Sequence, residues 1–371
     1  MFKFEVIHQS KRSAARVGRI HTPHGIIETP NFVPVATNAA IKTVDSSIIN
    51  QLDVQLMFCN TYHLLLHPGT EVVQAAGGLH SFMNRTAPLI TDSGGFQVFS
   101  LAYGSVKEEL KSKGLKTQQN SVLKINEEGV LFRSYRDGSP ILLTAESSVR
   151  AQKALGADII VPFDELPPYH TDPHVLRRSF ERTHRWETRS LEEHLKNPNN
   201  QAMYAIVHGG IDPNLRKKSC EILGNMAFDG FAIGGSLGKT RQEMVDMLSL
   251  MMRHLPHEKP NHLLGIGDLP SLEACIPLGI DTFDSSYPTK AARHGMLLTD
   301  NGPIKIEQHR WHACLDKISE APLCKDYSAA YIHHLFQAHE SVGHTLASIH
   351  NIDYMMKLMQ RYRQMILEDR I

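Results

Sequence analysis

Short apolar runs that end in small or polar residues recur along the whole chain. Runs that are apolar on both faces are typical of strands buried in a parallel sheet. Some of the intervals between them carry helical periodicity, as Met244, Met247, Leu248 and Met251 do. Eight such runs are present, at residues 32–38, 54–62, 88–95, 157–165, 203–210, 230–235, 262–268 and 280–286.

Eight strands that alternate with helices predict an α/β protein built as a (β/α)8 TIM barrel. An open doubly wound sheet would contain the same repeating unit, and the number of strands favours the barrel. Active sites of such barrels lie at the carboxyl ends of the strands. Polar residues collect at these ends, namely Asn60, Asp92, Asp164, His208, Asp268 and Asp284.

Several segments do not fit the repeat. Residues 1–30 resemble an antiparallel β hairpin that could cover the bottom of a barrel spanning residues 31–296. Residues 103–144 form an insertion, which begins with a polar stretch and ends in a second possible hairpin at 129–144. Residues 297–350 are too long for a loop and predict an inserted subdomain, and residues 351–371 predict a helix that closes the barrel.

Composition limits the possible partners and location. Lys plus Arg and Asp plus Glu number 39 each, so net charge gives no support for a nucleic-acid or membrane partner, and any such surface must be local. No apolar run has the length of a signal peptide core or a bilayer span, which predicts a cytoplasmic protein. The five cysteines are odd in number and scattered, as expected for reduced thiols.

Three strand-end carboxylates, Asp92, Asp164 and Asp284, should converge on one mouth of the barrel. A single strand-end aspartate commonly caps the following helix. Paired carboxylates are also the groups that displace a substituent at a sugar carbon, one as nucleophile and the other as proton shuttle. The glycine pairs at 94–95, 209–210 and 234–235 either form tight turns or let the backbone approach a flat ligand.

Nine motifs together resemble those of queuine tRNA-ribosyltransferases, also called tRNA-guanine transglycosylases. They occur in the family's order through nearly the whole chain: NTYHLLLHPG, TDSGGFQVFS, EEGVLFRSYRDGS, FDELPPY, AIVHGG, FAIGG, GIGD, FDSSYPTKAARHG and IHNIDYMMKLM. The resemblance implies a base exchange in queuosine modification of tRNA. Guanine at the anticodon wobble position is replaced by a free 7-deazaguanine base, without cleavage of the strand.

The same resemblance implies a role for each matching residue. Asp284 matches the nucleophile that forms a covalent ribosyl intermediate, and Asp92 matches the acid that accepts a proton from the incoming base. Asp164 matches the carboxylate that binds the amino edge of the base, and Phe96 would stack on its ring. The remaining pocket residues implied by the match are Ser93, Gly94, Gly95 and Gly235.

Two segments match those that hold the anticodon loop. The residues concerned are Gly265, Ile266, Gly267, Asp268, Leu269, Pro270 and Ser271, and Thr289, Lys290, Ala291, Ala292 and Arg293. Lys290 and Arg293 would contact phosphates, which proteins bind mainly through these residue types, or else they form a solvated charged pair. The family also implies a possible homodimer, formed near the subdomain that is altered here.

Departures from the family pattern concern base contacts and zinc. His208 replaces the usual glutamine, so one contact to the base edge must be made by an imidazole. The zinc ligands of bacterial members align with Ser319, Ala321, Cys324 and His350, and only the last two ligate well. Cys314 or His312 could substitute for a missing ligand, but we expect no cofactor for catalysis and a subdomain closed by apolar contacts.

The identity of the incoming base is predicted from Gly238, which stands where precursor-using bacterial members have valine. A missing side chain there would leave room for queuine instead of its smaller aminomethyl precursor. Leu166 replaces a cysteine and also indicates a remodelled pocket. Alternatively, Leu237 or Lys239 fills the space in a diverged loop.

Two other functional classes remain open. One is a non-catalytic tRNA-binding subunit, against which the presence of Asp92 and Asp284 argues. The other is a glycosidase acting on small sugars, which would share the paired acids but would not need the basic segment 288–295.

Overall fold

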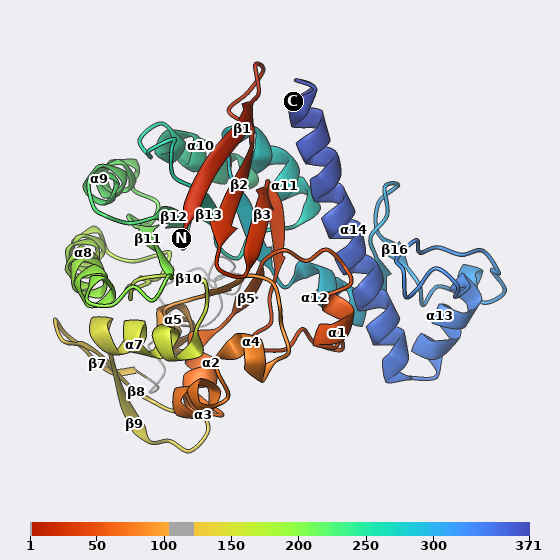
Figure 1. Cartoon of the computed structure of the whole chain (residues 1–371), viewed down its shortest axis with the longest axis horizontal. Helices are drawn as coiled ribbons and strands as arrows, with labels where there is room; N and C mark the ends of the chain where they lie inside the picture. Colours follow the sequence, from red (N-terminus) through yellow and green to blue (C-terminus); the bar gives the residue numbers. More distant parts are fainter. Residues whose placement is uncertain (1, 104–121) are drawn as a thin grey trace.

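A computed structural model describes residues 2–103 and 122–371 of the chain (Figure 1). The polar stretch predicted at residues 105–121 lies outside the described residues. The central feature is an eight-stranded sheet in which neighbouring strands pair in parallel. Its strands are β4 (Asn31–Pro34), β5 (Met57–Cys59), β6 (Leu89–Thr91), β10 (Ile159–Ile160), β11 (Ala202–Val207), β12 (Gly230–Ile233), β13 (Asn261–Leu263) and β14 (Thr282–Ser285).

The sheet closes on itself. Strand order runs β4-β14-β13-β12-β11-β10-β6-β5, and a parallel bridge between Val35 and Phe58 joins the two ends of that order. All eight strands overlap the runs expected from the sequence, and three of them begin one residue earlier, so the (β/α)8 barrel is confirmed and the open sheet is wrong.

Helices occupy the intervals between the barrel strands. Their starts follow from local capping: Asp172 and Asp212 each accept a backbone N–H and precede a proline at the first helical position, and Thr240 forms a capping box with Glu243. The helices are α1 (Ser46–Ile49), α2 (Thr61–Leu66), α3 (Thr70–Ala75), α4 (Leu79–Phe82), α5 (Gly95–Tyr103), α7 (Ala145–Leu155), α8 (Pro173–Leu195), α9 (Pro213–Gly224), α10 (Arg241–Met252), α11 (Leu269–Cys275) and α12 (Tyr287–Arg293).

The N-terminal segment forms an antiparallel sheet of three strands, β1 (Lys3–Gln9), β2 (Arg16–Thr22) and β3 (Gly25–Thr29). Ile20 and Ile27 have no exposed surface and pack with the side chains inside the barrel. Phe2 adds an edge-on contact to Tyr204 of β11, with ring centroids 5.9 Å apart. The expected hairpin is therefore present with one additional strand, and it fills the amino end of the barrel.

A second antiparallel sheet follows the undescribed residues. It consists of β7 (Val122–Ile125), β8 (Gly129–Arg133) and β9 (Pro140–Thr144). The hairpin expected at 129–144 corresponds to β8 and β9. Thr144 ends β9 and caps α7, so this sheet leads directly back to the barrel.

Beyond the barrel lie β15 (Met296–Leu297), β16 (Ile304–Lys305), the 3-10 turn His309–Trp311, α13 (Ala329–Gln337) and α14 (Ser341–Leu367). The closing helix α14 begins at Ser341, earlier than the predicted residue 351. Its additional turns bury Leu346, Ala347 and Ile349, which explains why the helical backbone starts there. Figure 1 shows α14 running from the α13 region along the barrel to the side of β1–β3.

Within the described part of the chain, no helix has both the length and the apolar composition needed to cross a bilayer.

Candidate active site

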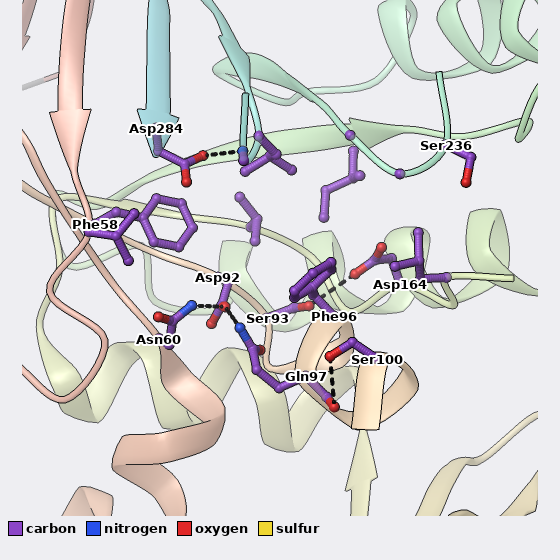
Figure 2. A pocket seen from close by; sticks show the side chains of 18 of the residues that line it. Phe58, Asn60, Asp92, Ser93, Phe96, Gln97, Ser100, Asp164, Ser236 and Asp284 are labelled. Atoms are coloured by element: carbon purple, nitrogen blue, oxygen red, sulfur yellow. Dashed lines mark hydrogen bonds between the residues drawn. The ribbon is translucent and has the colours of Figure 1, made fainter. Parts of the chain in front are cut away.

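A cavity of about 440 Å³ opens at the carboxyl ends of the barrel strands (Figure 2). Every barrel strand contributes to its wall, at or just beyond its last residue. The contributors, in strand order along the chain, are Val35, Asn60, Asp92, Asp164, His208, Gly235, Gly265 and Asp284. The three strand-end carboxylates therefore meet in one cavity, as their positions in the repeat predict.

Asp284 is the last but one residue of β14 and is 6% exposed. Its Oδ1 atom accepts a hydrogen bond from the backbone N–H of Gly265 at 2.8 Å. The Nε2 atom of His262 lies 3.1 Å from the same oxygen. The carboxylate is thus held from one side, in a cavity open to a ligand.

Asp92 is buried directly after β6 and is surrounded by donors. Asn60 Nδ2 and Gln97 Nε2 donate to its Oδ2 atom at 2.6 and 2.7 Å, and the backbone N–H of Thr61 donates to Oδ1 at 2.7 Å. Figure 2 shows the two amides pointing at the carboxylate. Burial raises the pKa of Asp92, and these hydrogen bonds to the charged form oppose the rise. Asp92 is consequently a carboxyl group that can hold or release a proton.

Asp164 lies across the cavity, where Ser93 Oγ donates to its Oδ1 atom at 3.0 Å. Burial raises the pKa of Asp164 to about 7. Behind this wall, Glu187 is fully buried, and burial raises its pKa well above the usual range. The raised value means that Asp164 is close to half ionised near neutral pH, so a ligand that donates hydrogen bonds would favour the charged form.

His208 is 7% exposed, and its Nε2 atom has no hydrogen-bond partner within the described residues. This atom lies 3.7 Å from Oδ2 of Asp164. Burial lowers the pKa of His208 well below the usual value, so the imidazole is neutral. An unpartnered buried nitrogen is costly unless a ligand supplies the missing bond.

Comparison with known proteins identifies the family. A family model described as queuine tRNA-ribosyltransferase matches residues 10–371. The chain belongs to the queuine tRNA-ribosyltransferase family. It is 64% identical to a queuine tRNA-ribosyltransferase of Protochlamydia amoebophila, over all of this chain and 96% of that protein. It is 55% identical to one from Chlamydia caviae and 54% identical to one from Chlamydia trachomatis serovar L2, each over all of this chain and 99% of the relative. The family's enzymes are pentosyltransferases.

Gly94 and Gly95 of the family motif TDSGG shape the backbone and do not themselves line the cavity. A Cβ atom at Gly95 would lie 2.6 Å from the carbonyl oxygen of Asp164, so only glycine lets α5 begin this close to the end of β10. Ser93, Phe96 and Gly235 do line the cavity. Phe96 is 47% exposed, which leaves its ring free to cover a bound ligand.

Gly238 does not have the position that the family resemblance assigned to it. It is not among the cavity-lining residues, and its φ angle is +132°. A Cβ atom there would lie 2.5 Å from Cβ of Glu243, the residue that completes the capping box of α10. A side chain at this position would meet Glu243 at the start of α10, so the contacts around Gly238 do not support the steric argument for queuine, and the identity of the base stays a prediction.

The two segments matched to anticodon binding follow β13 and β14 at the same mouth. Lys290 is exposed on α12, and Nη1 of Arg293 has no hydrogen-bond partner among the described residues. Other members of the segments serve the fold: Asp268 caps α11 through Ser271, and Thr289 and Ala292 are buried. The backbone of Gly265 contacts Asp284 directly.

Residues at the altered zinc position bond to one another and to the backbone. His350 Nδ1 lies 2.9 Å from Ser319 Oγ, and its Nε2 lies 2.8 Å from the carbonyl oxygen of Leu298. Cys324 is buried, and its Sγ lies 3.3 Å from the carbonyl oxygen of Leu346. Ala321 is buried as well and offers no ligand atom. The four residues therefore provide one thiol and one imidazole, and both already make hydrogen bonds within the protein.

A different group of possible metal ligands lies at the other end of the barrel. Within residues 2–103 and 122–371, His24, His80 and Asp158 are the one set of three such side chains whose ligand atoms lie within 4.8 Å of one another. Asp158 also accepts the backbone N–H of Leu89 at 2.8 Å, and His24 Nδ1 lies 2.7 Å from it. Through these contacts the group links the N-terminal sheet to the barrel.

Some residues of the site were not predicted as site residues. Gln97 and Thr61 hold Asp92, and His262 contacts Asp284. Arg216 of α9 is 1% exposed and donates to the carbonyl oxygens of Val207, Gly234 and Ser236, which shape the cavity wall. The one available signal for Gln97 was its place shortly after Asp92, in the first turn of the next helix; nothing in the local pattern marks Arg216.

Proposed function

We propose that the protein exchanges guanine at the wobble position of tRNA for a free 7-deazaguanine base, as a tRNA-guanine transglycosylase. The observation that carries the proposal is the meeting of Asp92, Asp164 and Asp284 in one cavity, in a chain that matches the family over residues 10–371. A reaction on tRNA also requires a compartment that contains tRNA, which supports a cytoplasmic location.

The first displacement would use Asp284 as nucleophile. Its carboxylate forms a bond to the ribose C1′ atom while the bond from C1′ to the guanine N9 breaks. Guanine leaves with the electron pair and takes a proton, which Asp92 can supply because burial raises its pKa. The result is a ribosyl ester of Asp284 in an uncut RNA strand.

The second displacement reverses these roles. The incoming base gives its N9 proton to Asp92, and N9 attacks C1′ from the face that guanine left. The ester bond breaks and Asp284 regains its charge. Two inversions retain the configuration at C1′, and Asp92 recovers the proton that it gave away.

Recognition of the base would rest on Asp164, His208 and Gly235, with Phe96 stacked on the ring. The base presents two N–H donors on one edge, which the two oxygens of an ionised Asp164 can accept. Its neighbouring carbonyl oxygen requires a donor, and the neutral imidazole of His208 provides one if Nε2 carries the proton. This arrangement explains how a histidine replaces the glutamine usual at this position.

Incubation of the protein with tRNA and labelled guanine tests the proposal. Incorporation of label into intact tRNA is the expected result. Binding of tRNA without incorporation would instead identify a non-catalytic subunit, and turnover of simple glycosides without tRNA would identify a glycosidase. Whether queuine or its precursor is the natural base, and whether a homodimer forms, stay predictions.

A further inference from the structure

His262 has a place next to the proposed nucleophile that the resemblance does not assign. It belongs to β13, it has no exposed surface, and its side chain points into the barrel beside β14. Its ring is stacked on Phe58 of β5, with centroids 6.0 Å apart and planes inclined by 15°. A polar ring buried at this point needs partners for both nitrogens.

Both ring nitrogens have such partners. Nδ1 lies 2.8 Å from Thr282 Oγ1, and Nε2 lies 3.1 Å from Asp284 Oδ1. An ionised carboxylate can only accept, so the Nε2 atom must carry a hydrogen. The hydroxyl of Thr282 lies between Nδ1 and the carbonyl oxygen of Asn261, to which it can donate at 3.3 Å. Asp284 therefore fixes Nε2 as a donor, and Thr282 holds the opposite side of the ring.

The two donors of Asp284 act on the same oxygen. Gly265 N–H and His262 Nε2 both contact Oδ1, whereas Oδ2 accepts no hydrogen bond from the described residues. Rotation of the carboxylate about its Cβ–Cγ bond would break both of these bonds, so together they favour one orientation. Oδ2 keeps its lone pairs, and Figure 2 shows the oxygen of Asp284 without a dashed bond directed toward the other cavity side chains.

We propose that His262 is a positioning residue, which together with the Gly265 backbone holds Oδ1 of Asp284 so that Oδ2 is the atom that attacks the ribose. The inference rests on the exchange reaction proposed above. In the ester, Oδ2 is bonded to C1′ and Oδ1 becomes the carbonyl oxygen. When the second displacement breaks that bond, both donors are in place to receive the returning charge.

Three variants test this role. His262→Phe keeps a flat ring on Phe58 and removes the donor. The longer side chain of His262→Gln can place an amide N–H near the position of Nε2, where it can donate to Asp284. The shorter side chain of His262→Asn places its amide only near the position of Nδ1. His333→Phe is the matched control, because His333 is also buried and bonded to a backbone carbonyl, of Ile306 in the C-terminal subdomain.

The measurements are kcat and KM for guanine exchange into tRNA. We expect His262→Phe and His262→Asn to lower kcat about 10-fold to 100-fold, with KM for tRNA within about twofold, since misplacement of a reacting group has effects of this size. His262→Gln should recover kcat to within about fivefold, and His333→Phe should match the wild type. Wild-type kcat in a folded His262→Phe or His262→Asn variant, or a His262→Gln variant as slow as His262→Asn, would overturn the assignment.

These outcomes separate the inference from the proposed function. If the wild type itself incorporates no guanine, the exchange reaction is wrong. If the wild type is active and the donor at position 262 has no effect on kcat, only the positioning role is wrong. Should His262→Phe fail to fold, the comparison of His262→Gln with His262→Asn decides the question alone.

Discussion

Asp164 and His208 face each other across 3.7 Å from the ends of neighbouring strands β10 and β11. Burial moves their pKa values in opposite directions, that of Asp164 to about 7 and that of His208 well below its usual value. Near neutral pH, His208 is therefore neutral, while Asp164 exchanges between its neutral and its negatively charged form. A bound base would favour the charged form of Asp164.

Base affinity should depend on pH through Asp164. The base needs the ionised carboxylate, and the raised pKa means that Asp164 becomes protonated as pH falls through about 7. We expect affinity for guanine to be constant above this value and to fall about tenfold per pH unit below it. Calorimetric titration across this range of pH measures the profile. Asp164→Asn should bind weakly with no such step; a step that persists in this variant would assign it to another group.

Asp284→Asn should abolish exchange and keep tRNA binding. The amide cannot form the ester, whereas the surface around β13 and β14 is unchanged, so we expect a loss of kcat of roughly a thousandfold or more, the effect of removing a nucleophile in other enzymes. Wild-type protein mixed with tRNA should also form a complex that survives denaturation. Equal trapping by Asp284→Asn would show that the nucleophile is assigned wrongly.

Lys290→Ala and Arg293→Ala should weaken tRNA binding and flatten its salt dependence. Each phosphate contact releases counterions, so the slope of log K against log salt should fall by about one for each phosphate-binding side chain that is removed. Lys196 is a suitable control, because it is 70% exposed after α8, at the opposite end of the barrel. Unchanged slopes in both α12 variants would contradict an anticodon-holding role.

Gly238→Val should act on stability and not on the choice of base. A side chain there meets Glu243 and strains a backbone with a φ angle of +132°, so we expect unfolding to become easier by about 1–3 kcal/mol. Competition between queuine and its aminomethyl precursor, measured on both proteins, checks this. Preserved stability together with a reversed base preference would instead support a steric filter at this position.

Removal of metal ions by a chelator should not change the thermal stability of the protein. Since Cys324 and His350 are engaged by hydrogen bonds, excess EDTA should not alter Tm, and purified protein should contain no stoichiometric zinc. His350→Ala should reduce the free energy of unfolding by about 2–4 kcal/mol, because it leaves a cavity and an unpaired Leu298 carbonyl. A lower Tm in EDTA would indicate a bound metal.

The barrel could be predicted because its strands are apolar on both faces, a pattern that surface elements do not show. The buried face of α10 was likewise visible in the spacing of Met244, Met247, Leu248 and Met251, which are all buried. The meeting of the three carboxylates in one cavity could be predicted, because the carboxyl ends of all the parallel strands lie at the same end of a barrel.

The supporting contacts could not be predicted, because they depend on distances between residues remote in sequence. Arg216 donates hydrogen bonds to carbonyl oxygens at the ends of two neighbouring strands, and no local sequence pattern predicts these bonds. The direction of the absent side chain at Gly238 depends on a positive φ angle, which a sequence alone does not contain. The early start of α14 at Ser341 follows from burial against the barrel and not from a strong capping residue, since the side chain of Glu340 makes no capping bond.

The closure of the barrel through β4 and β14 bears on synthesis of the chain. During translation the groups that would recognise a base, from β6 to β12, leave the ribosome before Asp284 does. Because β14 pairs with β4, an incomplete polypeptide without β14 cannot close the barrel, so the finished cavity and Asp284 are acquired in the same step of synthesis.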